Sequence, residues 1–345
     1  MGALMPATTP PVPLVDGFGR VHRDLRISVT DRCNFRCTYC MPEEGMQWLA
    51  REEILSFEEI TRIARVFVER YGVDSIRLTG GEPTVRAHLP VLVEKLAALG
   101  VELTMTTNGS TLRNQAQALA DAGLRRINVS LDSLRRDRFL ELTRRDELAK
   151  VLDGIEAAKE AGLDPVKVNV VLVGGVNDDE VVDFARFGRD NDVTVRFIEF
   201  MPLDADGGWE HAQVVPQAEI VRRIAEVFPM EPVVRGNEPA EQWRYLDRPP
   251  GRPGSSAGDV VGVIPTVTRP FCESCDRVRL TAEGQLRNCL FALDEFDLRA
   301  PLRDGGTDDD LAAVMQRAVG AKWAGHAIGN VQFIRPRKSM SQIGG

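Results

Sequence analysis

Three cysteines, Cys33, Cys37 and Cys40, stand in a C-x3-C-x2-C spacing within the segment TDRCNFRCTYCMP. The segment is too short to be anything but a tight loop, so the three thiolates converge on one point. A structural zinc ion takes four Cys or His ligands, whereas a four-iron cluster can be held by three cysteines with its fourth iron left open. The spacing favours such a cluster over a zinc site completed by a distant ligand, or three unrelated thiols.

A second group of three cysteines lies near the other end of the chain. Cys272 and Cys275 form a C-x2-C pair, and Cys289 follows after thirteen intervening residues. The pair alone would indicate a redox site or half of a zinc site. Because no further Cys or His lies nearby to complete four ligands, Cys289 favours a second cluster with an open iron that substrate could occupy.

Two arginines lie between the cysteines of this second group. Arg277 and Arg279 occupy alternate positions of an extended stretch, so their side chains project to the same side. Guanidinium groups placed in this way form a fork that matches phosphate oxygens. An isolated Arg-x-Arg is more often an exposed polar face, but the adjoining cysteines favour a phosphate site.

The elements that must position these residues alternate between strands and helices. A strand at residues 25–29 leads into the first cysteine loop, and Ser56 with Glu59 predicts a capping box that opens a helix ending at Gly72. Further strands are expected at residues 75–79, 102–106, 126–131, 166–173, 193–200 and 259–265. Further helices are expected at residues 89–99, 114–122, 147–161, 179–190, 217–228 and 308–322.

Alternating strands and helices of this length imply a parallel sheet with right-handed crossovers. Polar residues recur at the C-terminal end of nearly every strand. Such ends ring one mouth of a barrel, whereas a doubly wound sheet concentrates its chemistry at one crevice. The predicted fold class is therefore α/β, an incomplete (β/α)6 barrel of the triosephosphate-isomerase type.

Composition narrows the class of protein further. The chain has 345 residues, a net charge of −8, six cysteines and four scattered histidines. Six clustered cysteines in a chain of this length indicate metal in a reducing compartment, not a disulfide framework. Without an apolar run of about 18 residues or a secretory pattern, we expect a cytoplasmic protein with no membrane span. The negative charge argues against general nucleic-acid binding.

Several motifs occur in the order TDRCNFRCTYCMP, LTGGEPTVR, TTNG, NVSLDS, KVNVV, RFIEFM, FCESCDRVRL and a terminal Gly-Gly. This series resembles the GTP 3′,8-cyclase family of molybdenum-cofactor biosynthesis, within the radical S-adenosylmethionine (SAM) superfamily, over nearly the whole chain. The resemblance implies an incomplete barrel closed on its open side by a C-terminal iron–sulfur region. It divides the chain into a flexible segment at 1–20, a radical SAM partial barrel at 21–230 and a C-terminal region at 231–345.

The resemblance also implies cofactors and the residues that hold them. Two 4Fe-4S clusters are expected, one on Cys33, Cys37 and Cys40 and the other on Cys272, Cys275 and Cys289. The residues implied for SAM are Tyr39, Gly81, Ser130 and Met201. Those implied for GTP are Arg26, Arg77, Thr106, Lys167, Arg277, Val278 and Arg279, of which Arg277 and Arg279 are catalytic. One departure is Ser75, which stands where many members carry a lysine.

The reaction implied is conversion of GTP to 3′,8-cyclo-7,8-dihydro-GTP. A radical derived from SAM takes hydrogen from the ribose 3′ carbon, which then attacks guanine carbon 8. The implied partners are an external one-electron donor and the next pathway enzyme, cyclic pyranopterin monophosphate synthase. The protein itself is expected to be a monomer or a homodimer. The terminal Gly344 and Gly345 are thought to reach the pocket in this family, although a frayed tail is the simpler interpretation.

Two other functions remain open from the residues alone. A radical SAM peptide-modifying enzyme would also carry auxiliary clusters in its C-terminal extension, but such extensions normally need more than three cysteines. A non-catalytic metal scaffold that binds nucleotides is the second alternative. Such a scaffold could hold iron–sulfur or zinc. Metal analysis tests it, since two cubane clusters require about eight iron atoms per chain, whereas zinc without a brown colour would support the scaffold.

Overall fold

The computed structural model describes residues 10–42, 44, 46–204, 207–234, 236, 238–248, 257–329 and 333–344. Within these residues one sheet runs through the molecule in the order β12-β11-β10-β1-β2-β3-β4-β5-β6-β9-β8-β7. Its strands are β1 (Asp24–Ser28), β2 (Ser75–Thr79), β3 (Glu102–Thr107), β4 (Arg126–Ser130), β5 (Val166–Leu172), β6 (Thr194–Glu199), β7 (Met230–Pro232), β8 (Glu241–Tyr245), β9 (Val260–Ile264), β10 (Arg277–Leu280), β11 (Gln285–Arg287) and β12 (Phe296–Asp297).

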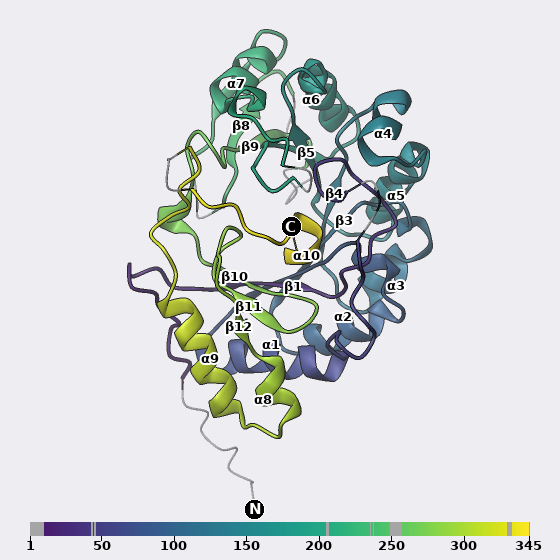
Figure 1. Cartoon of the computed structure of the whole chain (residues 1–345). Coiled ribbons are helices and arrows are strands. Elements are labelled where there is room, and N and C mark those ends of the chain that lie inside the picture. The colour runs from purple at the N-terminus through teal and green to yellow at the C-terminus, as the bar shows by residue number, and fades with distance from the viewer. Residues whose placement is uncertain are drawn as a thin grey trace, which may run out of the picture.

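Helices cover the outer face of this sheet (Figure 1). They are α1 (Phe57–Tyr71), α2 (Leu89–Ala97), α3 (Ala116–Asp121), α4 (Arg136–Thr143), α5 (Leu148–Glu160), α6 (Val181–Asp190), α7 (Gln217–Ala225), α8 (Arg299–Arg303), α9 (Asp308–Gly320) and α10 (Met340–Ile343). The short α10, near the C-terminus, lies inside the ring of strands. The remaining helices form the outer layer.

The predicted α/β fold with an incomplete barrel is confirmed. Strands β1 to β6 are parallel neighbours in chain order. The C-terminal region adds one more parallel strand at each end of this run, because β9 pairs with β6 and β10 pairs with β1. Since β9 and β10 lie at opposite ends of the parallel strands, the barrel stays open between them.

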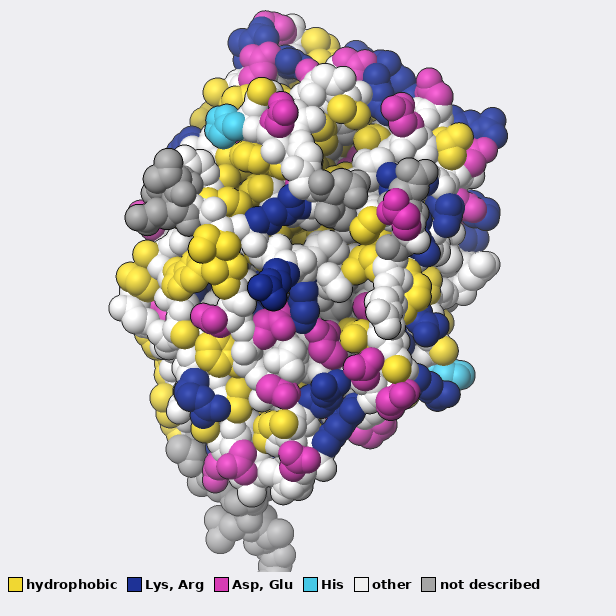
Figure 2. All heavy atoms as spheres, viewed as in Figure 1, with side chains coloured by type: hydrophobic (Ala, Val, Ile, Leu, Met, Phe, Trp, Pro, Cys, Tyr) yellow, Lys and Arg dark blue, Asp and Glu magenta, His cyan; other side chains and the backbone are white. Residues whose placement is uncertain are grey.

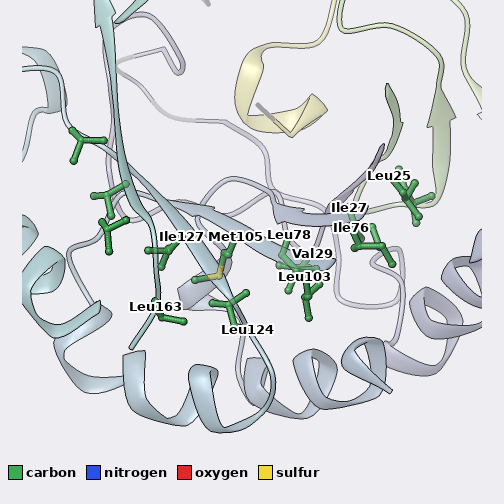
Figure 3. Close-up of a cluster of buried hydrophobic side chains, with 14 of the residues drawn as sticks. Leu25, Ile27, Val29, Ile76, Leu78, Leu103, Met105, Leu124, Ile127 and Leu163 are labelled. Carbon is green, nitrogen blue, oxygen red and sulfur yellow. The ribbon is translucent and has the colours of Figure 1, made fainter. Parts of the chain in front are cut away.

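Alternation along the parallel strands separates the hydrophobic core from the interior of the barrel. Figure 3 shows Leu25, Ile27, Ile76, Leu78 and Met105 on the face of the sheet that meets the helices, while the tail helix α10 lies on the other face. The residues between them in sequence therefore point into the barrel, and on β1 and β2 these include arginines.

Helix α1 illustrates how local sequence signals fix an element. The Ser56 hydroxyl accepts a hydrogen bond from the backbone N–H of Glu59, and the Glu59 carboxylate accepts one from the backbone N–H of Ser56, which completes the predicted capping box. The helix ends at Gly72, whose φ of 69° is a left-handed conformation that glycine adopts without a Cβ penalty. Between these ends, Ile60 and Phe67 are buried against the sheet.

The N-terminal segment is packed over the part that the structure describes. We expected residues 1–20 to be flexible, and residues 1–9 lie outside the described residues. From residue 10 onward, an antiparallel bridge joins Val15 to Val21, and Leu14 and Asp16 are buried. We call residues 14–22 the N-terminal hairpin. It contacts the segment that carries the second cysteine group.

The segment at 230–258, whose path the sequence did not indicate, adds strands to the edge of the sheet. Strands β7 and β8 pair antiparallel, and β8 pairs antiparallel with β9; residues 249–256 lie outside the described residues. Figure 2 shows acidic and basic side chains interspersed on the viewed face. Among the described residues, no helix combines the length and the apolar character needed to cross a bilayer.

The packing of α6 on β6 gives a first test of this fold. Phe184 is fully buried and meets Phe197 edge to face, with ring centroids 6.3 Å apart. We expect Phe184→Ala to lower the free energy of unfolding by about 3–5 kcal/mol, because a large cavity would remain. Urea denaturation followed by circular dichroism measures this change. Leu140→Ala, at a side chain that is 45% exposed, should stay within about 0.5 kcal/mol of wild type, and equal losses would contradict the assigned packing.

Candidate active site

All six cysteines line one cavity on the inner face of the sheet. The cavity has a volume of about 290 Å³ and lies between the first cysteine loop, the C-terminal ends of the strands and the segment around the second cysteine group. Nine other sequence-predicted site residues also line it: Arg26, Tyr39, Arg77, Gly81, Thr106, Ser130, Met201, Arg277 and Arg279. The structure therefore brings together most of the predicted residues, from segments that are far apart in the sequence.

Two predicted residues lie elsewhere. Lys167 lines a second cavity, which adjoins the first one and is described below. Val278 is fully buried and belongs to the hydrophobic core between sheet and helices. Because its neighbours on β10 point into the barrel, the Val278 side chain faces away from the cavity, and only its backbone is on the substrate side.

The first cysteine loop is held by a glycine turn that follows β2. The backbone N–H of Gly81 donates to the carbonyl oxygen of Thr30 at 2.8 Å. A Cβ on Gly81 would lie 2.3 Å from the carbonyl oxygen of Arg32 and 2.5 Å from that of Asp31. The sequence suggested that this glycine lets backbone approach SAM; the structure adds a second reason, which is contact with the loop that carries Cys33.

The thiols of the first group lie in apolar and acidic surroundings. Burial, followed by the carboxylate of Glu82, raises the pKa of Cys33 to about 12. Burial also raises the pKa of Cys40 to about 11, and that of Cys37 well above its ordinary value. In the metal-free chain these groups are neutral thiols, so metal binding must release protons from all three.

The second group lies in cationic surroundings. Burial opposes ionisation of Cys275, but the charges of Lys322 and Arg277 outweigh it and lower the pKa of this thiol. At Cys272 burial dominates and raises the pKa. The two cysteine groups therefore differ in the charge that surrounds them, although both face the same cavity.

The cysteines fit iron–sulfur clusters by their chemistry and placement. All six are free thiols that are neither fully buried nor fully exposed, and each group of three opens on the shared cavity. Within the described ranges, no three Cys, His, Asp or Glu side chains surround one point closely enough to hold a single metal ion. A four-iron cluster is a wider group, in which each cysteine binds a different iron atom.

Beneath the cysteines, arginines from neighbouring strands form a layer across the barrel. In the sheet register Arg26 lies between Arg279 on β10 and Arg77 on β2. Burial, and then the nearby charges of Arg277 and Arg77, lower the pKa of Arg26 well below its ordinary value. Like charges buried side by side are costly unless an anion joins them, so this layer fits a polyanionic ligand.

One carboxylate lies among these arginines. Asp24 Oδ2 is 3.6 Å from Nε of Arg26 and 3.7 Å from Nε of Arg277. The other oxygen, Oδ1, is buried without a hydrogen-bond partner among the described residues. Asp24 therefore offsets part of the positive charge and holds two of the guanidinium groups on the cavity side.

A second cavity of about 250 Å³ adjoins the first, because Arg26, Arg77, Arg196, Pro239 and Arg277 line both. Its wall also includes Lys167, Arg126 and the carboxylates of Glu102 and Glu238. Burial, followed by the charge of Arg196, lowers the pKa of Lys167 to about 8. Ser75 lines this cavity as well, so the residue that replaces an expected lysine removes one cation from a site that keeps several.

Arg196 is the principal residue that sequence analysis missed. It is 4% exposed, and its Nη2 donates to Asn128 Oδ1 at 2.7 Å and to Asn169 Oδ1 at 2.8 Å. Burial lowers its pKa to about 10. The signal was present, since Arg196 is a charged residue on a largely apolar strand, as are Arg26 and Arg77.

The C-terminal tail enters the first cavity. Met340 and Ser341 of α10 line it, and the carbonyl oxygen of Gly344 accepts a hydrogen bond from Nη1 of Arg279. A Cβ on Gly344 would lie 2.6 Å from Oγ1 of Thr79, so only glycine fits there. Gly345, the other residue of the expected pair, lies outside the described residues.

The carboxyl group of Asp132 joins the first cysteine loop to β5. Tyr39 donates its hydroxyl to Asp132 Oδ2 at 2.6 Å, and the backbone N–H of Val171 donates to Oδ1 at 2.8 Å. Burial nevertheless raises the pKa of Asp132 from 3.8 to about 6. Asp132 lines the cavity beside Ser130, which places an ionisable group next to the residues implied for SAM.

The raised pKa of Asp132 predicts a pH-dependent stability. Between about pH 4 and pH 6 the folded chain keeps a proton that the unfolded chain has lost, so stability falls as pH rises through this window. Asp132→Asn removes this titration. We expect the variant to gain about 3 kcal/mol relative to wild type between pH 4 and pH 7, as measured by urea denaturation of metal-free protein. If the free energies of unfolding of the two proteins changed in parallel between pH 4 and pH 7, the raised pKa of Asp132 would be contradicted.

The close approach at Gly81 predicts the effect of adding one methyl group. Because the new Cβ in Gly81→Ala would overlap the backbone of residues 31 and 32, the first cysteine loop must move. We expect reconstituted protein to lose the first metal site and so to bind about four iron atoms fewer per chain than wild type. Gly320→Ala, where no atom lies within 4 Å of the added Cβ, is the control and should load fully.

Comparison with known proteins agrees with this geometry. The radical SAM superfamily model matches residues 27–188, and the Molybdenum Cofactor Synthesis C model matches residues 193–328. Among solved structures, Streptococcus suis SuiB bound to precursor peptide SuiA overlaps 59% of this chain and 45% of its own length, at 18% identity and a TM-score of 0.49. A likeness at that level carries no argument.

Curated relatives match over almost the whole chain. The GTP 3′,8-cyclase of Streptomyces coelicolor is 49% identical over 96% of this chain and 96% of its own. The GTP 3′,8-cyclase 2 of Mycobacterium bovis is 47% identical over 96% of this chain and 92% of its own, and the GTP 3′,8-cyclase of Rhodopirellula baltica is 46% identical over 98% and 93%. Because its sequence is 46–49% identical to these relatives over at least 96% of its length, the chain belongs to the GTP 3′,8-cyclase family of the radical SAM superfamily.

Proposed function

We propose that this protein is an enzyme that converts GTP to 3′,8-cyclo-7,8-dihydro-GTP, the first step of molybdenum-cofactor biosynthesis. The observation that carries the proposal is that two groups of three cysteines and a layer of buried arginines face one cavity. The relatives named GTP 3′,8-cyclase support the same activity. No peptide-modifying or purely structural role accounts as well for a polyanion site between two cysteine groups.

The cofactors follow from the cysteine groups. Membership of the radical SAM superfamily implies a 4Fe-4S cluster and SAM, and Cys33, Cys37 and Cys40 would hold that cluster. When bound and reduced, cluster and SAM together supply a carbon radical able to abstract hydrogen. Cys272, Cys275 and Cys289 would hold a second 4Fe-4S cluster, whose open iron would bind the guanine base.

Four residues would hold SAM beside the first cluster. Gly81 keeps the turn close to the cysteine loop, Ser130 offers a hydroxyl at the end of β4, and Met201 offers an apolar surface for adenine. Tyr39 is fixed by its hydrogen bond to Asp132. These groups line the cavity on the side of the first cysteine loop, which leaves the arginine side for the nucleotide.

GTP would extend from the second cysteine group into the adjoining cavity. Arg26, Arg77 and Arg196 line both cavities, and Lys167 lines the second one. Their positive charge suits a triphosphate, whereas Thr106, which lines the first cavity, offers a hydroxyl to the ribose. Val278 would contribute through its backbone, because its side chain is in the core.

Arg277 and Arg279 are the proposed catalytic residues. Both line the first cavity between the two sets of cysteines, where a fixed positive charge can stabilise phosphate and charge that develops on the substrate. Burial, followed by the charges of Arg26 and Arg277, lowers the pKa of Arg279 well below its ordinary value. The surrounding strands and Met340 and Ser341 of α10 line the cavity, and with substrate bound they would limit the access of water to a reactive radical.

The partners and location follow from the reaction. A radical SAM enzyme needs an external one-electron donor, and we propose that the product passes to the next pathway enzyme, cyclic pyranopterin monophosphate synthase. We place the protein in the cytoplasm, where thiols stay reduced. We expect it to be a monomer or homodimer that binds neither nucleic acid nor membranes.

The chain would divide into two main regions. Residues 21–230 form the radical SAM barrel, and residues 231–345 form the region with the second cluster.

Isotope transfer tests the reaction directly. Reconstituted protein is incubated anaerobically with SAM, dithionite and GTP deuterated at the ribose 3′ carbon. We expect deuterium in 5′-deoxyadenosine and a cyclised dihydro-guanosine triphosphate in the products, both by mass spectrometry. Deuterium-free 5′-deoxyadenosine would refute the abstraction site, and about eight irons per chain without SAM cleavage would favour the nucleotide-binding scaffold.

Substitution of the two arginines tests their role in the same assay. We expect Arg277→Ala and Arg279→Ala each to lower product formation by at least about 100-fold, because a preorganised charge is lost, while iron content stays at the wild-type value. Arg136→Ala, at an exposed arginine paired with Asp146, should be unaffected. Loss of iron in the first two variants would instead assign them a structural role.

A further inference from the structure

A lysine outside the proposed substrate site contacts the second cysteine group. Lys322 follows α9 and is only 4% exposed. Its Nζ lies 3.6 Å from Sγ of Cys275 and donates to the carbonyl oxygens of Cys275 at 3.0 Å and Arg277 at 2.9 Å. A buried ammonium group therefore lies next to the sulfur of a proposed metal ligand.

The fourth neighbour of this ammonium group fixes its position. Nε2 of His22, on the N-terminal hairpin, lies 3.0 Å from Nζ of Lys322. Because the ammonium group can only donate, this ring nitrogen accepts, which requires a neutral imidazole. His22 is fully buried, and its Nδ1 has no hydrogen-bond partner among the described residues. The contact of the His22 ring with Nζ therefore helps to hold Lys322 in place.

The N-terminal hairpin holds the same region at a second point. Arg20 donates to the carbonyl oxygen of Cys272 at 2.7 Å and to those of Trp323 at 2.5 Å and Ala324 at 2.8 Å. Its Nε also pairs with Asp16 at 2.6 Å. The hairpin thus holds the backbone of the cysteine pair through Arg20 and the lysine beside it through His22.

Among the described residues, no lysine or arginine hydrogen-bonds to a sulfur of the first cysteine group, and the charge of Arg36 makes only a minor contribution at Cys33. Sγ of Cys33 receives the backbone N–H of Phe35 at 3.4 Å and lies 4.0 Å from the amide nitrogen of Asn108. The ionisable groups that act on these thiols include the carboxylates of Glu82 and Asp132. The first cysteine group is therefore surrounded mainly by carboxylates, and the second cysteine group is surrounded by cationic side chains.

Hydrogen bonds and positive charge near a ligand sulfur favour the more negative, reduced state of an iron–sulfur cluster. We propose that Lys322, held by His22 and the N-terminal hairpin, is a positioning residue that raises the reduction potential of the cluster bound to Cys272, Cys275 and Cys289 above that of the first cluster. The inference rests on the proposed function, since it requires the second cluster. It assigns a purpose to a buried lysine and histidine that the substrate site does not use.

The test measures the potentials of the reconstituted full-length protein by electron paramagnetic resonance during a dithionite titration without SAM or GTP. We expect Lys322→Met to lower the ratio of reduced to oxidised second cluster about tenfold at a fixed potential, which is about 59 mV for one electron. The signal of the first cluster should not move. A triple variant, Cys33→Ala, Cys37→Ala and Cys40→Ala, carries only the second cluster and identifies its signal.

Further variants separate charge from packing. Lys322→Arg keeps the cation and should hold the ratio within about threefold of wild type, whereas Lys322→Gln keeps a donor without charge and should fall between Arg and Met. If Lys322→Met does not bind iron, the reduction potential of the second cluster in Lys322→Gln is compared with wild type instead. Lys338→Met removes a lysine that pairs with Glu283 and Glu295, and should leave both potentials unchanged.

The outcomes separate this inference from the proposed function. Equal potentials in wild type, Lys322→Gln and Lys322→Met would overturn the role of Lys322 while leaving the second cluster in place. A triple cysteine variant that binds no iron would overturn the second cluster itself. A potential that falls in the Met variant and is restored in the Arg variant supports the proposal, because a change in folding alone would not track charge.

Discussion

The inward-facing arginines constrain the whole structure. A parallel strand that is buried on both sides usually carries apolar residues throughout, yet β1, β2, β6 and β10 each place arginine on the inner face. Asp24 lies close to two of them, and in the adjoining cavity its carboxylate and those of Glu102, Glu238 and Asp276 face six cationic side chains. The interior is thus stable as an open, hydrated cavity or as a site filled by an anion, but not as a packed hydrophobic core.

The same constraint explains why the barrel is incomplete. A closed barrel of this width fills its interior with side chains, whereas here the parallel strands end with β9 on one side and β10 on the other. The segment that connects these two strands carries Cys272 and Cys275 across the opening. The open side therefore provides the place for the second cysteine group.

Much of the architecture could be predicted because its signals are local. The strand at β2 and the capping box of α1 follow from short patterns, and each predicted strand in the barrel lies within one or two residues of the observed one. Helix α4 was missed, because only two of its apolar side chains, Phe139 and Leu142, are buried and its helical pattern is correspondingly weak. The hairpin β7–β8 was missed because its stability comes from pairing with β9, which no local pattern indicates.

The site was predictable to a different extent. Most of the residues that cysteine spacing and the family motifs pointed to line the cavity, among them Arg26 and Arg77, which stand on otherwise largely apolar strands. Arg196 carried the same signal and was missed, and Val278 was included although its side chain is in the core. The contacts of Lys322 and His22 had no sequence signal, because they join positions far apart in the chain.

The pairing of β1 with β10 has a consequence for how the molecule is made. Arg20 and Cys272, which hydrogen-bond to each other, are 252 positions apart, and the register of β1 with β10 spans a similar separation. Contacts so distant form late, because chain entropy must be overcome first. On the ribosome, β1 stays an unpaired edge until nearly all of the polypeptide has emerged, so the second cysteine group and its surroundings assemble as one of the final events of biogenesis.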